Sequence, residues 1–279
     1  MRPPEIFDRN ARRIRRDRIA TRYADYDFLR AAMIEGLLDR LASVKRSFHD
    51  VLDLGGFDGA FPAPPGARIA RLDAGHRFAT QTGAVQGDED RLPFADTSFD
   101  LIVSAGVLDT VNDLPGALAL VRRALRPDGL FLAAFAGAGS LPALRAALRE
   151  AEGDRPAPRL HPQIDVRAAG DLLLRAGFAL PVADVETLDV RYRDIGRLLD
   201  DLRNMGAGNL LAERRAMPRD VLVKAAASFA AQADADGRTT ERFAIVYLTA
   251  WSPSPDQPVP ARRGSATASL AAAIGKPTP

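Results

Sequence analysis

The chain has 279 residues, of which 47% are hydrophobic and 27% charged, which is enough for one large domain with a full core. Its formal net charge of +2 gives no global reason to expect a nucleic-acid partner. It contains no cysteine and three histidines far apart in sequence, so disulfides and cysteine nucleophiles are excluded and no metal site is expected.

The N-terminal 22 residues hold eight arginines against three acids. This run has two interpretations: a solvated helix face, or a docking surface for an acidic partner or a membrane. Residues 26–42 then place Leu29, Met33 and Leu37 on one stripe, which predicts a helix packed on a core. We therefore expect residues 1–48 to form an N-terminal helical extension.

Short apolar runs alternate with helical patterns in the first half of the chain. A helix is predicted over residues 113–126, and "RPDG" ends it. The alternation predicts an α/β fold, a doubly wound Rossmann-like sheet of about seven strands with extra helices in the second half. Its buried parallel strands are expected at 50–54, 68–72, 99–104 and 128–135.

The second half of the chain is more helical. We expect the last strand to be antiparallel and to pair with the strand at 128–135. The α/β domain is expected over 49–252 with a helical insertion near 193–240, followed by a flexible tail over 253–279 that is rich in Pro, Ala, Ser and Gly. The individual elements are helices near 140–152, 167–176, 194–205 and 219–235, and strands near 179–191 and 242–251.

Candidate binding residues follow the predicted strands. In an open α/β sheet, ligands bind beyond the carboxyl ends of the strands, where the strand order reverses. A carboxylate after the second strand can accept hydrogen bonds from both hydroxyls of a ribose, and Asp88 can take an adenine amino group. Singly, each acid could instead cap a turn or helix. Together they predict a cofactor site made of Asp53, Gly55, Gly56, Gly59, Asp73, Asp88, Glu89 and Ser104.

This order of motifs resembles the class I S-adenosylmethionine-dependent methyltransferases, and "LPFADTSFDLIVS" followed by "LRPDGLF" is typical of them. The segments "IFDRNARRIRRDR", "VNDLPGAL", "DLRNMGAGN" and "RRGSATASL" are similar to the mitochondrial complex I assembly factor five family and its bacterial relatives. That family is akin to the malonyl-carrier methyltransferases of biotin synthesis. The resemblance runs from Ile6 to Leu270, so we expect no transit peptide.

The resemblance implies a methyltransferase fold, S-adenosyl-L-methionine as cofactor and a respiratory-complex subunit as protein partner. Arginine hydroxylation is the reaction attributed to the assembly-factor branch. The sequence departs from the family in its first turn, "DLGGFDG", where Gly56 replaces a cysteine and Phe57 replaces the middle glycine. The next segment, "AFPAPPGAR", is too rich in proline for the usual helix. Asp109 and Thr110 replace a His-Trp pair.

Two functions remain open at this point. As an enzyme, the chain would modify a protein or a small acid, with Asp109 as the catalytic base beside the reacting centre or merely a solvated loop acid. As a non-catalytic assembly chaperone, it would use the same fold with a degenerate cofactor loop, and Phe57 would be a core residue. A nucleic-acid methyltransferase ranks third, because the basic residues cluster at one terminus without aromatics. No apolar stretch is long enough to span a bilayer, so we expect a cytoplasmic protein with at most peripheral membrane contact.

Overall fold

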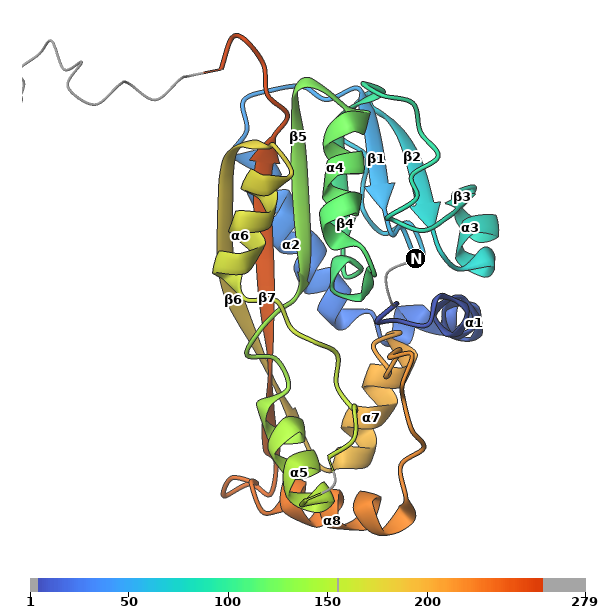
Figure 1. Ribbon diagram of the computed structural model, residues 1–279, viewed down its shortest axis with the longest axis vertical. Helices are drawn as coiled ribbons and strands as arrows, with labels where there is room; N and C mark the ends of the chain where they lie inside the picture. The colour runs from blue at the N-terminus through green and yellow to red at the C-terminus, as the bar shows by residue number, and fades with distance from the viewer. Residues whose placement is uncertain (1–4, 155, 258–279) are drawn as a thin grey trace, which may run out of the picture.

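The computed structural model describes residues 5–154 and 156–257. A seven-stranded sheet runs through it in the order β3-β2-β1-β4-β5-β7-β6 (Figure 1). The first five strands in this order are parallel, and β7 is antiparallel to both β5 and β6. The predicted α/β sheet and its antiparallel last strand are confirmed. The strands are β1 (Asp50–Leu54), β2 (Arg68–Asp73), β3 (Val85–Gln86), β4 (Phe99–Ala105), β5 (Leu125–Ala136), β6 (Ala179–Tyr192) and β7 (Thr239–Trp251).

Helices cover both faces of this sheet, with α4 and α6 on one face and α2 on the other (Figure 1). Side chains of β5 alternate between the two resulting cores: Phe131 and Phe135 join the α4–α6 side, and Leu130 and Leu132 join the α2 side. The α-helices are α1 (Arg9–Ile19), α2 (Phe28–Ala42), α3 (His76–Thr82), α4 (Leu114–Ala124), α5 (Pro142–Glu152), α6 (Val166–Arg175), α7 (Ile195–Asn204) and α8 (Arg219–Ala230).

The long strands β6 and β7 extend past the rest of the sheet and carry α5, α7 and α8 at their far end (Figure 1). The last of these helices is shorter than the sequence predicts, because it ends at Ala230 and not near residue 235. The cause is a turn in which the Asp234 carboxylate accepts hydrogen bonds from the backbone of Asp236 and Arg238.

Residues 60–67 contain no helix, as their prolines predict. Most of the predicted tail, residues 258–279, lies outside the described residues. Within the part of the chain that the structure describes, no helix combines the length and the apolar character needed to cross a bilayer. The strand order reverses between β1 and β4, so the carboxyl ends of these strands are the place to look for a ligand site.

Candidate functional site

The turn after β1 crosses the end of β2. The backbone amides of Gly55 and Gly56 both donate to the Leu72 carbonyl, at 2.8 and 3.0 Å. Gly55 has φ +83°, and a Cβ there would lie 2.4 Å from the Val107 side chain. Only glycine satisfies both conditions, so this part of the turn keeps the close backbone approach that a cofactor loop needs.

Phe57 occupies the place where the middle glycine was expected. Its φ of +45° shows that the backbone keeps the left-handed conformation that a glycine would adopt. Its ring is 4% exposed, stacks on Tyr23 at 4.9 Å between centroids and meets Phe78 edge-on at 5.5 Å. Phe57 therefore keeps the positive φ, and its interpretation as a core residue is confirmed.

Asp53, at the end of β1, is a buried carboxylate whose two oxygens have no hydrogen-bond partner. The nearest cations are Arg71 at 3.5 Å and Arg30 at 3.8 Å, too far for a good hydrogen bond. Burial raises the pKa of Asp53 to about 6. An unsatisfied buried carboxylate costs stability, so its presence at the strand end points to a ligand-binding role.

The other acids predicted for the cofactor site, Asp73, Asp88 and Glu89, all pair with arginines of helix α1. Arg16 binds Asp73 at 2.5 Å, and Arg12 binds both oxygens of Glu89 at 2.5 and 2.6 Å. Two outer pairs extend the series, Arg13 with Asp88 at 2.6 Å and Arg9 with Asp90 at 2.6 and 2.7 Å. These four arginines share one face of α1, because they follow one another at intervals of three, one and three residues.

The two inner ion pairs are buried. The side chains of Arg12 and Glu89 are 6% and 0% exposed, and those of Arg16 and Asp73 are 6% and 0% exposed. Burial opposes the charged form of Glu89, but the charge and hydrogen bonds of Arg12 outweigh it and hold the pKa of Glu89 below its usual value. The expectation that the arginine run is a solvated or docking surface is thus wrong for Arg12 and Arg16.

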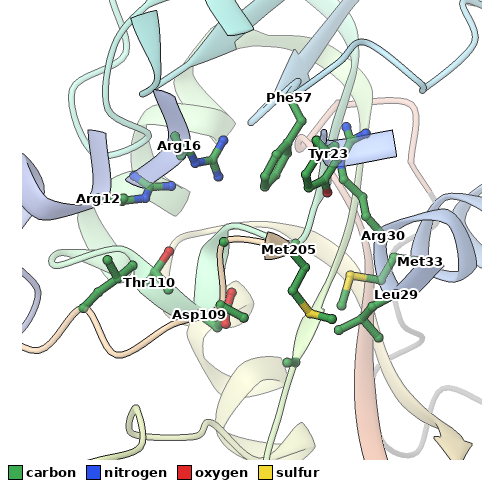
Figure 2. A pocket seen from close by; sticks show the side chains of 15 residues that line it. Arg12, Arg16, Tyr23, Leu29, Arg30, Met33, Phe57, Asp109, Thr110 and Met205 are labelled. Atoms are coloured by element: carbon green, nitrogen blue, oxygen red, sulfur yellow. The ribbon is translucent and has the colours of Figure 1, made fainter. Parts of the chain in front are cut away.

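A cavity of about 70 Å³ lies between α1, the turn at Phe57 and the loop after β4. Figure 2 shows Arg12 and Arg16 reaching toward Phe57, with Asp109 and Thr110 across the space. The Arg16 guanidinium lies 3.7 Å from the centroid of the Phe57 ring. Sites for cofactors and drug-sized ligands measure roughly 300–1,000 Å³. With α1 in this position the cavity is too small for a nucleoside cofactor.

Asp109 belongs to a short 3₁₀ helix, Leu108–Thr110, and its half-buried side chain lines the cavity. Burial raises the pKa of Asp109 to about 6. Such a carboxylate is largely ionised at neutral pH and can accept a proton. The structure therefore places the predicted base at the cavity, not on a solvated loop.

The other predicted residues lie nearby in different roles. Ser104 is buried, and its hydroxyl donates to the Leu54 carbonyl at 3.0 Å, so it ties β4 to β1. Gly59 has φ +77° and its carbonyl accepts from Arg71 at 3.3 Å. Asp88 keeps one buried oxygen without a partner.

Within residues 5–154 and 156–257, no group of three or more acidic or histidine side chains could hold a metal ion.

Sequence reasoning missed the cationic side of the cavity, formed by Arg12, Arg16 and Arg30. Arg30 is 4% exposed and donates to the Gly56 carbonyl at 3.1 Å and to Asp58 at 3.2 Å. Two features of the sequence could have indicated this pairing: the spacing of the arginines in α1 and the acidic run "DED" at 88–90.

Comparison with known proteins places the chain in a family. Residues 62–133 match the methyltransferase domain. The zebrafish protein "arginine-hydroxylase NDUFAF5, mitochondrial" is 33% identical over 295 residues, which cover 97% of this chain and 91% of the relative. This chain belongs to the NDUFAF5 family. The resemblance inferred from the sequence is confirmed.

Two further proteins show the breadth of this chain's relationships. Malonyl-[acyl-carrier protein] O-methyltransferase of a Methylovorus species is 32% identical over 266 residues, covering 86% of this chain and 88% of the relative. The solved structure of the YcgJ protein from a Bacillus matches with a TM-score of 0.54 at 19% identity, over 79% of this chain and 98% of that one. The structural match shows the methyltransferase fold. The zebrafish and Methylovorus relatives are both named as enzymes. The cytoplasmic location expected for this chain stays a prediction.

Proposed function

We propose that this NDUFAF5-family protein is an S-adenosylmethionine-dependent enzyme that modifies a protein or small-acid acceptor, and that it acts in the assembly of respiratory complex I. The names of its relatives, an arginine-hydroxylase and an O-methyltransferase, support an enzyme. The observation that carries the proposal is Asp53, a buried carboxylate with two unsatisfied oxygens at the point where the strand order reverses.

The residues at the strand ends fit the chemistry of this cofactor. Asp53 can accept hydrogen bonds from the methionine ammonium, Asp73 from the ribose hydroxyls and Asp88 from the adenine amino group. Gly55 leaves the backbone bare for close approach. When bound, S-adenosylmethionine supplies an electrophilic methyl group. Asp109 lines the cavity and can take a proton from the acceptor, since its raised pKa still leaves it largely ionised at neutral pH.

The test of this proposal is calorimetric titration of S-adenosylmethionine and of adenosine into the full chain and into Asp53→Asn. We expect Asp53→Asn to bind S-adenosylmethionine about tenfold more weakly, because a neutral amide loses the charge-assisted bond to the ammonium. Adenosine, which has no ammonium, should bind both chains equally. Asp189→Asn, at an exposed aspartate on β6, is the matched control and should bind as wild type does. Equal binding of S-adenosylmethionine to wild type and to Asp53→Asn would show that Asp53 does not bind the cofactor and would contradict the proposal.

A second function, a non-catalytic assembly chaperone, is favoured by one observation. The acids that would hold the nucleoside are already paired with arginines of α1, and the cavity beside them measures about 70 Å³. A chaperone of this kind would not bind S-adenosylmethionine in any variant. The same calorimetric series therefore separates the two functions.

A further inference from the structure

Helix α1 lies across the carboxyl ends of β1 and β2 (Figure 1). We call its four paired arginines, Arg9, Arg12, Arg13 and Arg16, the latch face. Each residue of the latch face contacts an acid from the end of β2 or from the loop after β3. The middle of α1 is thus held by ion pairs and not by an apolar stripe. On its outer side Ile14 is 41% exposed.

Apolar anchors hold the two ends of this helix. Before α1, Phe7 packs with Leu210 and Leu211, and its backbone exchanges hydrogen bonds with the Asn112 side chain at 2.8 and 3.0 Å. At the other end, Ile19 is buried beside Gly206. These apolar contacts lie at the ends of the helix, outside the latch face, which meets the sheet through ion pairs.

The latch face uses the oxygens that a nucleoside would need. One oxygen of Asp73 accepts from Arg16 and from the Phe57 amide, and the other accepts from the Gly75 amide. One oxygen of Asp88, the acid proposed for the adenine amino group, accepts from Arg13 at 2.6 Å. A ribose hydroxyl placed on Asp73 would have to displace the Arg16 guanidinium. Binding of a nucleoside and closure of α1 therefore exclude each other.

We propose that α1 is an internal latch on the cofactor site, in which Arg12 and Arg16 stand in for the ligand and S-adenosylmethionine binds only after α1 has moved off the acids. This inference rests on the proposed function, since it takes Asp73 as the acceptor of the cofactor's ribose hydroxyls. The closed form satisfies two buried acids that would otherwise be left charged and unpaired. The latch thereby stabilises the site without a ligand. The apparent affinity for S-adenosylmethionine is then the intrinsic affinity multiplied by the fraction of molecules that are open.

The first experiment uses the wild-type chain and amide hydrogen exchange. Saturation with S-adenosylmethionine should speed exchange in a peptide covering α1, because the ligand holds the helix off the acids, while a peptide covering β1 becomes protected. Faster exchange in α1 supports the latch. Slower or unchanged exchange in α1, with calorimetry showing that the ligand is bound, overturns it.

The second experiment removes the latch contacts. Arg12→Met/Arg16→Met should bind S-adenosylmethionine about tenfold or more tightly than wild type, because the open fraction rises. The matched control is Arg18→Met/Arg22→Met, which removes the same charge from two exposed positions near the same helix and should bind as wild type does. If Arg12→Met/Arg16→Met does not fold, the exchange experiment on wild type still decides the matter.

The outcomes separate the latch from the proposed function. Equal affinity in wild type and in folded Arg12→Met/Arg16→Met overturns the latch and leaves the enzyme function standing. Weaker binding in that variant also overturns the latch, since it would make the arginines ligands of the cofactor. Absence of binding in every chain overturns the proposed function, and the latch with it.

Discussion

Two regions of the molecule pair arginine with carboxylate in opposite surroundings. Under α1, Arg12 and Glu89 meet at 2.5 Å with side chains 6% and 0% exposed. On the ribbon formed by β6 and β7, Arg242 and Asp189 meet at 2.8 Å with side chains 52% and 43% exposed. Water already solvates the exposed pair, so losing it changes little. Water cannot reach the buried pair, so removing one partner leaves the other charged and unpaired in the interior. Burial, not the number of ion pairs, decides what each contributes.

The largest effect is expected from Arg12→Met. The free energy of unfolding should fall by about 3–5 kcal/mol, because Glu89 is left charged and unpaired. Urea denaturation at neutral pH measures it. The double change Arg12→Met/Glu89→Leu should recover most of the loss, since no buried charge remains. A loss below about 1 kcal/mol for Arg12→Met would place this pair in the same class as an exposed one.

The next effect concerns Phe57, which packs against the buried end of the latch face. Phe57→Gly should lower the free energy of unfolding by about 2–4 kcal/mol: loss of a buried ring costs about 3–5 kcal/mol, and relief of the left-handed backbone returns about 1 kcal/mol. Phe57→Ala keeps the backbone strain, so it should be about 1 kcal/mol less stable than Phe57→Gly. Equal stability of the two variants would show that φ +45° carries no strain.

The third effect is a pH dependence at Asp53. Its pKa of about 6 lies above its usual value of 3.8, so between these pH values the folded protein holds a proton that the unfolded chain releases. Stability therefore falls as pH rises through this window. Asp53→Asn removes that loss, so its stability relative to wild type should rise by about 1–3 kcal/mol between pH 4 and pH 7. Denaturant midpoints at the two pH values measure this difference.

The sign at Asp189 should be the reverse. The hydrogen bond from Arg242 lowers the pKa of Asp189, so its contribution is present at neutral pH and is lost as pH falls. Asp189→Asn should therefore lose stability relative to wild type as pH rises from acid to neutral, by a small amount because both groups are exposed. The same sign in Asp53→Asn would contradict the raised pKa of Asp53.

The smallest effect is expected from Arg242→Ala on the exposed ribbon. The unfolding temperature should stay within about 2 °C of wild type, because both groups of the pair are hydrated with or without each other. Differential scanning calorimetry measures it beside Arg12→Met. A drop in Arg242→Ala as large as that in Arg12→Met would remove the distinction between the two regions.

Much of the fold was predictable from local pattern. The runs that became β1, β4 and the second half of β5 are predominantly apolar, because both faces of a central parallel strand are covered. The end of α8 was not predictable from its apolar period, because the Asp234 turn stopped the helix early. Asp109 was identified from its motif, but its half-buried place at the cavity required the packed structure.

The sequence by itself determined the sheet, its strand-end acids and the membership of the family. Only the tertiary structure decided what the arginines do, because Arg16 and Asp73 are 57 residues apart and Arg12 and Glu89 are 77 apart. The sequence of a charged run is the same whether its side chains are solvated by water or paired with carboxylates. The contacts of Phe7 and Ile19 fix the position of α1. In that position the arginines of α1 lie over the acids at the strand ends and pair with them.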